Sequence, residues 1–95
     1  MLSPAQKRFL SGEAHTLNPV VIIGKNGLTK SVLDEIDCAL KSHELIKIKV
    51  ASGEKDEREA MLDTICGDLA AYPVKHIGKT LVIYRQAEKP QLVLP

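Results

Sequence analysis

The sequence predicts one small α/β domain, with the element order α-β-α-β-α-β-β and a mixed four-stranded sheet packed by helices. Three segments with the apolar period of a helix alternate with short β-rich runs, and the chain closes with two such runs separated by Gly78-Lys79. With 95 residues and 44% hydrophobic content, only one core can form. The β-α-β connections imply right-handed crossovers and parallel pairing, whereas the closing hairpin must be antiparallel. The pattern leaves the strand order open.

The first helix is predicted from its start signal. Ser3 is a plausible N-cap, Pro4 occupies the first helical position, and Gln6 completes a capping box. We expect this helix to end near His15, because the following "LNP" disfavours helical backbone.

Residues 20–23, "VVII", form an unbroken β-branched run. Such a run is typical of a strand buried on both faces, so we expect a central strand that ends at Gly24. Helices two and three should share one face of the sheet, and the first helix should cover part of the other.

The next two elements follow from periodicity. Thr29 is the candidate N-cap of a helix over residues 30–43, with apolar residues at Val32, Leu33, Ile36, Ala39 and Leu40. "ELIKIKVA" then alternates as a strand does, with Ile46, Ile48 and Val50 on the core face and Lys47 and Lys49 on a basic face.

The third helix should begin at Asp56, as N-cap with Glu59 at the third position, and stop before Pro73. Its apolar residues are Met61, Leu62, Ile65, Cys66 and Leu69. Two short strands over residues 74–77 and 80–85 then form a tight hairpin. We expect residues 1–88 to form the domain and residues 89–95 a C-terminal tail that packs loosely through Leu92 to Leu94.

Charge is unevenly distributed along the chain. Residues 54–68 hold six acids and two bases and are formally −4, so with a net charge of +1 the remainder is +5. This predicts an acidic side and a basic side, and a basic face is what a polyanion would require. An ordinary solvated helix explains the acids as well.

Gly24, Lys25, Asn26 and Gly27 join a predicted strand to a helix N-terminus. Backbone N–H groups and the helix dipole attract anions there, and glycines let a phosphate come close. The GxxG spacing alone is weak evidence, because two glycines around a turn more often form a plain loop. A Walker loop and the GxGxxG fingerprint are both absent, so we expect no nucleotide or other small-molecule substrate.

Further basic residues could extend a phosphate site. Lys30 follows the loop, and we expect one tract that also includes Lys47, Lys49, Lys7 and Arg8, with the acidic helix pointing elsewhere. Whether Lys75, Lys79, Arg85 and Lys89 join it is left open. Aromatic residues are only 3%, which favours recognition of backbone and shape over stacking on bases.

Catalytic and metal-binding constellations are not evident. His15, His43 and His76 fall near the ends of different elements, and Cys38 and Cys66 lack CxxC spacing and are expected to be buried thiols. We therefore expect no enzyme, metal site or cofactor. Without an apolar run of about 18 residues or a signal peptide, a soluble cytoplasmic protein without membrane contact is expected.

Three segments, "LNPVVIIGKNGLTKSVLDEIDCAL", "HELIKIKV" and "HIGKTLVIYR", resemble the CRM (YhbY-like) RNA-binding domain family, as a bacterial single-domain member. The resemblance implies a fold like the C-terminal domain of the third bacterial translation initiation factor. It also implies RNA binding through Gly24, Lys25, Asn26 and Gly27 with the adjacent basic surface, and association with ribosomal RNA of precursor large ribosomal subunits.

The hypothesis is therefore a monomeric RNA-binding protein that assists ribosome assembly. The alternative is a protein-protein adaptor that docks through the acidic third helix.

Overall fold

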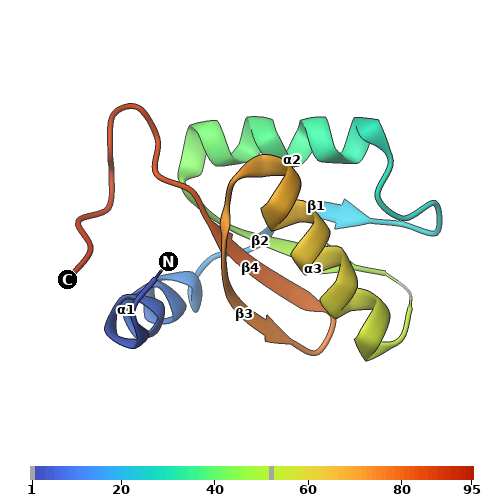
Figure 1. Cartoon of the computed structure of the whole chain (residues 1–95), viewed down its shortest axis with the longest axis horizontal. Helices are drawn as coiled ribbons and strands as arrows, with labels where there is room; N and C mark the ends of the chain where they lie inside the picture. The colour runs from blue at the N-terminus through green and yellow to red at the C-terminus, as the bar shows by residue number, and fades with distance from the viewer. Residues whose placement is uncertain (1, 52) are drawn as a thin grey trace.

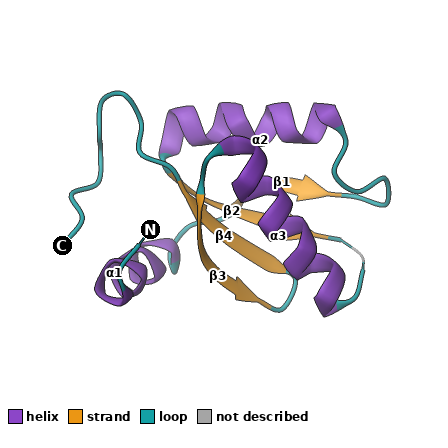
Figure 2. Ribbon diagram, viewed as in Figure 1, coloured by secondary structure: helices purple, strands orange, loops and turns teal. Residues whose placement is uncertain are grey.

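The computed structural model describes residues 2–51 and 53–95, and Figure 1 shows the predicted element order. The elements are α1 (Pro4–Ala14), β1 (Pro19–Ile23), α2 (Lys30–His43), β2 (Leu45–Val50), α3 (Lys55–Leu69), β3 (Tyr72–Ile77) and β4 (Thr80–Tyr84). Figure 2 shows α2 and α3 together on one face of the sheet, with α1 separate from them. The predicted α/β class is confirmed.

The strands lie in the order β1-β2-β4-β3. β1 pairs parallel with β2, whereas β4 pairs antiparallel with both β2 and β3, which confirms a mixed sheet. The strands on either side of α3, β2 and β3, do not pair with each other. The closing hairpin places β4 between them. Pro73 is tolerated in β3 because that strand lies at an edge of the sheet.

The prediction that residues 20–23 form a central strand buried on both faces is wrong. β1 is the other edge strand: Val21 and Ile23 are buried, but Val20 is 48% and Ile22 63% exposed. The reason is that α1 packs mainly on β2, β3 and β4, so the face of β1 that carries Val20 and Ile22 stays largely uncovered. An unbroken β-branched run thus reflects strand propensity here and not two-sided burial.

Two cores lie on the two faces of the sheet. The larger packs α2 and α3 on the sheet through residues that include Ile36, Leu40, Leu62, Ile65 and Ile83. The smaller packs α1 and the C-terminal tail on the opposite face, with Leu10, Leu45, Val82 and Tyr84 at its centre. Helices two and three therefore share a face as predicted.

The first two helix starts agree with the sequence. Ser3 Oγ accepts from the Gln6 N–H at 3.1 Å while the Ser3 N–H donates to Gln6 Oε1 at 3.0 Å, which confirms the capping box. At α2, the N-cap Thr29 accepts from the Val32 N–H through Oγ1 at 3.1 Å.

The predicted start of the third helix is wrong by two residues. Glu54, not Asp56, is the N-cap, and its N–H donates to Glu57 Oε1 at 3.3 Å. Gly53, at φ +105°, lets the chain turn into the helix earlier than side-chain signals alone indicate.

The C-terminal tail is fastened to the domain by a buried carboxylate. Glu44, fully buried between α2 and β2, accepts from the N–H groups of Ala87, Gln91 and Leu92 at 2.7–2.9 Å. Leu92 is half-buried in the smaller core, whereas Val93 is 88% exposed. Among the described residues, no helix is long and apolar enough to cross a membrane.

Candidate nucleic-acid interface

The glycine loop projects from one end of the molecule, between β1 and α2 (Figure 1). The Gly27 N–H donates to the Gly24 carbonyl at 3.1 Å, which closes a tight turn with Lys25 and Asn26 exposed at its tip. Gly27 has φ +70°, a conformation that favours glycine. Gly24 has no such requirement, and a Cβ added there would meet nothing within 4 Å. Its surface is therefore open to a ligand.

The loop leads directly into the N-terminus of α2. The Thr29 N–H donates to the Gly27 carbonyl at 3.1 Å, and the Val32 N–H is taken by the Thr29 hydroxyl. In the described part of the chain, this leaves the N–H groups of Lys30 and Ser31 as the first-turn donors without a protein acceptor. Free donors at the positive end of a helix suit a phosphate oxygen.

Two backbone bonds bring other segments to the same end of the sheet. The Ala51 N–H donates to the Ile23 carbonyl at 2.9 Å, so the end of β2 lies against the start of the glycine loop. The Val50 N–H donates to the Lys79 carbonyl at 2.8 Å, which adds the β3–β4 turn. Lys79, whose membership in the site the sequence left open, thus lies at the loop end of the molecule.

Lys47 and Lys49 lie on the sheet face away from α2 and α3, as the alternation in β2 predicts. Lys49 is exposed between Ile22 on β1 and Thr80 on β4. Lys47 is half-buried and lines a shallow hollow with Ser11 of α1, with the α1 C-cap His15 and with Lys75 of β3. Lys75 therefore joins the basic face, although the sequence alone did not assign it.

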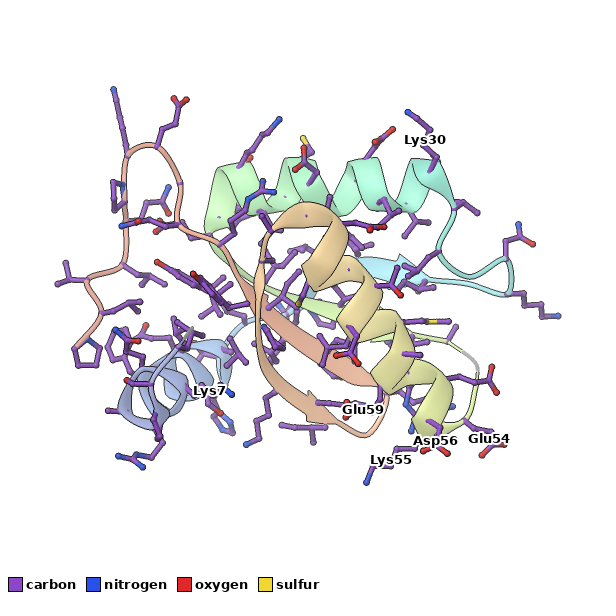
Figure 3. The ribbon with its side chains drawn as sticks, viewed as in Figure 1. Lys7, Lys30, Glu54, Lys55, Asp56 and Glu59 are labelled. Carbon is purple, nitrogen blue, oxygen red and sulfur yellow. The ribbon has the colours of Figure 1, made fainter. Side chains whose placement is uncertain are left out.

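The structure divides the predicted single basic tract. Lys30 lies 3.1 Å from Asp34, and Figure 3 shows its side chain pointing away from the sheet. Lys7 and Arg8 are exposed on α1, at the opposite end of a molecule 36 Å long from the loop. Lys47 and Lys75 lie between α1 and the glycine loop. A path from the basic residues of α1 to the loop therefore crosses the sheet.

The acids are separated from the lysines by the sheet. α3 packs on the face opposite Lys47 and Lys49, as expected, but it begins at the loop end, where Figure 3 shows Glu54 and Asp56. One of its acids is engaged locally, since Glu59 Oε1 lies 2.6 Å from Nδ1 of His76. The charge separation is therefore between faces and not between ends.

Arg85 is a structural residue. Its Nη1 donates to Asp37 Oδ1 at 2.8 Å and to the Leu69 carbonyl at 2.9 Å, which ties β4 to both α2 and α3. The hydrogen bond from Arg85, assisted by Lys41, holds the pKa of Asp37 below its usual value. Lys89 lies in the tail, beside a hollow over α2.

The histidines and cysteines do not assemble a site. Within residues 2–51 and 53–95, no group of three His, Cys, Asp or Glu side chains could hold a metal ion. Burial raises the pKa of the Cys66 thiol to about 11. The prediction that both cysteines are buried is wrong for Cys38, which is exposed because it lies just outside the apolar stripe of α2.

Comparison with known proteins gives concordant matches. The family model described as the CRS1 / YhbY (CRM) domain matches residues 2–85. An RNA-binding protein of Haemophilus influenzae is 48% identical over 94 residues, covering 99% of this chain and 95% of its own. YqeI of Bacillus subtilis, named a "probable RNA-binding protein", is 33% identical, and each chain is covered completely. The solution structure of the hypothetical protein SAV1595 from Staphylococcus aureus matches both chains completely, with a TM-score of 0.88 and 33% identity.

Proposed function

The chain belongs to the CRS1 / YhbY (CRM) domain family, and we propose that it is an RNA-binding protein that assists assembly of the large ribosomal subunit. One observation carries the RNA-binding part. A glycine turn with Lys25 at its tip opens onto free N–H donors of α2, next to a strand that presents Lys49. The protein acts as a cytoplasmic monomer, without a catalytic step or a cofactor.

A phosphate would be held at the start of α2. The N–H groups of Lys30 and Ser31 provide directional donors, and Lys25 provides a mobile charge at the turn. Gly24 carries no side chain at the point of approach. Such contacts read no sequence, so affinity comes from the backbone and falls steeply with salt.

The two faces of the sheet would orient the RNA. Lysines face it on one side, while the acids of α3 lie on the other and repel a polyanion. The proposed target is ribosomal RNA in precursors of the large subunit, and this target follows from the family resemblance. The relatives that are named as RNA-binding proteins support the binding of RNA, but their names do not specify which RNA.

Crosslinking in cells tests this proposal. Ultraviolet crosslinking followed by sequencing of the attached RNA should recover segments of large-subunit ribosomal RNA, enriched in precursor particles over mature ribosomes. Recovery of messenger RNA alone, or of no RNA, would contradict the ribosomal assignment or RNA binding, respectively.

One structural observation favours the adaptor alternative. Three acids of α3 are exposed and take part in no ion pair among the described residues: Asp56, Asp63 and Asp68. This alternative predicts that charge reversal at Glu57 and Asp63 abolishes ribosome association while binding to naked RNA persists. Asp63 is the cleaner position, because Glu57 also caps α3. The RNA-binding proposal predicts that Asp63→Lys leaves ribosome association intact.

A further inference from the structure

The sheet face opposite α2 and α3 is only partly covered. α1 packs over Leu45, Val82 and Tyr84, toward the end of the sheet away from the glycine loop. The exposed or half-buried positions on this face, which we term the open sheet face, are Ile22, Lys47, Lys49, Lys75, Ile77 and Thr80. They belong to all four strands.

Apolar and basic side chains are mixed in two registered rows across this face. One row runs from Ile22 through Lys49 and Thr80 to Ile77, and the adjoining row places Lys47 and Lys75 on the two sides of Val82. At a spacing of about 4.8 Å per strand, the two isoleucines lie roughly 14 Å apart with a lysine between them.

Among the described residues, the isoleucines of this face are exposed and its lysines take part in no ion pair. Ile22 is 63% and Ile77 54% exposed, so both offer apolar surface to a ligand. None of the four strands contains Asp or Glu, so the lysines of the face have no carboxylate beside them in the sheet. A ligand that offers both apolar surface and negative charge would complement this face.

We propose that the open sheet face binds a single-stranded segment of RNA, with unpaired bases on Ile22 and Ile77 and phosphates at the lysines between them. This inference rests on the proposed function and specifies the class of RNA. A duplex presents phosphates but keeps its base faces stacked inside, so it would leave both isoleucines in water. Unpaired bases offer flat apolar faces next to their own phosphates.

The position of Ile22 connects this face to the loop. Ile22 lies two residues before Gly24. An RNA segment held at the glycine turn would therefore pass directly onto β1. From there the path crosses Lys49 and Lys47 toward Lys75, and reaches α1 beside Ser11 and His15. Lys7 is one helical turn before Ser11 on the same side of α1. The separated basic residues become parts of one route only if the RNA crosses the sheet.

The test uses the whole chain with two fluorescent probes, a 12-nucleotide oligouridylate and a 12-base-pair RNA duplex. Ile22→Thr and Ile77→Thr together remove apolar surface and retain β-branched side chains, so the fold should persist. The control is Val93→Thr, which makes the same kind of change at an even more exposed apolar residue, in the tail and away from the sheet. We expect the double variant to bind the single strand about five- to tenfold more weakly and the duplex as before. Lys75→Ala should also weaken single-strand binding, and Ile22→Phe should strengthen it by stacking.

Other results separate the two proposals. Single-strand affinity unchanged in the isoleucine and Lys75 variants, with Lys25→Ala weakened, would overturn the open-face inference and leave RNA binding at the loop standing. A wild-type dimer that the isoleucine variants convert to monomer, with RNA affinity unchanged, would assign the face to a second copy of the chain instead. No binding of either probe by the wild type would overturn both proposals.

Discussion

The Val50 N–H donates to the Lys79 carbonyl at 2.8 Å, and this bond fastens the β3–β4 turn to the end of the lysine-bearing strand. Together with the bond from Ala51 to Ile23, it fixes the end of the sheet from which the glycine loop projects. The loop thus starts from an ordered platform and ends at a capped helix. A ligand bound there would meet donors that are already in place, which lowers the ordering cost of binding.

The two glycines of the loop should respond differently to alanine. Gly24→Ala introduces a methyl group into open space, so thermal stability should be unchanged, while RNA affinity falls about tenfold if a phosphate occupies that space. Gly27→Ala places a side chain at φ +70° and should cost roughly 1 kcal/mol of stability. Thermal melts and RNA titrations of both variants check this. Normal RNA affinity in Gly24→Ala would argue against close approach of a phosphate.

Glu44 should make the stability of the tail depend on pH. Burial raises the pKa of this carboxyl, but hydrogen bonds from Ala87, Gln91 and Leu92 outweigh it and leave the pKa below its ordinary 4.5. The folded protein therefore favours the charged form. The resulting stability is complete above the ordinary value and is lost as pH falls through the lowered one.

Glu44→Gln should accordingly lower the free energy of unfolding by about 1–3 kcal/mol at neutral pH, and the difference from the wild type should shrink in acid. Denaturant titrations at pH 7 and at pH 3 measure this. The amides of Ala87, Gln91 and Leu92 should exchange faster in the variant. An equal loss of stability at both pH values would show that the carboxylate charge is not what holds the tail.

Arg85 should matter for stability and not for RNA. Its guanidinium is committed to Asp37 and to the Leu69 carbonyl, on the helix side of the sheet. We expect Arg85→Ala to destabilise the fold by about 1–2 kcal/mol, since a partly exposed pair and a carbonyl contact are lost, with the RNA salt slope unchanged. Urea unfolding and a salt titration measure the two effects. A smaller salt slope in this variant would place Arg85 in the interface.

The starts of the first two helices and the alternation of β2 could be predicted because they depend on local chemistry. Ser3 and Thr29 cap as their sequence positions indicate, and Lys47 and Lys49 share the face that the period of two requires. The strand order could not be predicted, since it depends on where the closing hairpin inserts. The place of Lys75, across Val82 from Lys47, follows from that insertion, whereas the exposure of Ile22 follows from where α1 packs.

The candidate site was predictable in its centre and not in its extent. Gly24 to Gly27 form the turn that their composition suggests, but net charge could not show that Lys30 points away from the sheet or that Arg85 is already paired. The role of Glu44 was also missed. This role depends on tertiary contacts, and a buried carboxylate that accepts hydrogen bonds from the tail has no local sequence signature.

The salt dependence of RNA affinity in Lys25→Ala tests the central proposal most directly. Lys55→Ala is the matched control, because it removes the same charge from an exposed residue of acidic α3. We predict that Lys25→Ala weakens binding to all RNA sequences alike and reduces the magnitude of the slope of log K against log salt by roughly 0.7–0.9, one lost phosphate contact, while Lys55→Ala leaves the slope unchanged. An unchanged slope in Lys25→Ala, or an equal change in both variants, would contradict a phosphate site at the glycine loop.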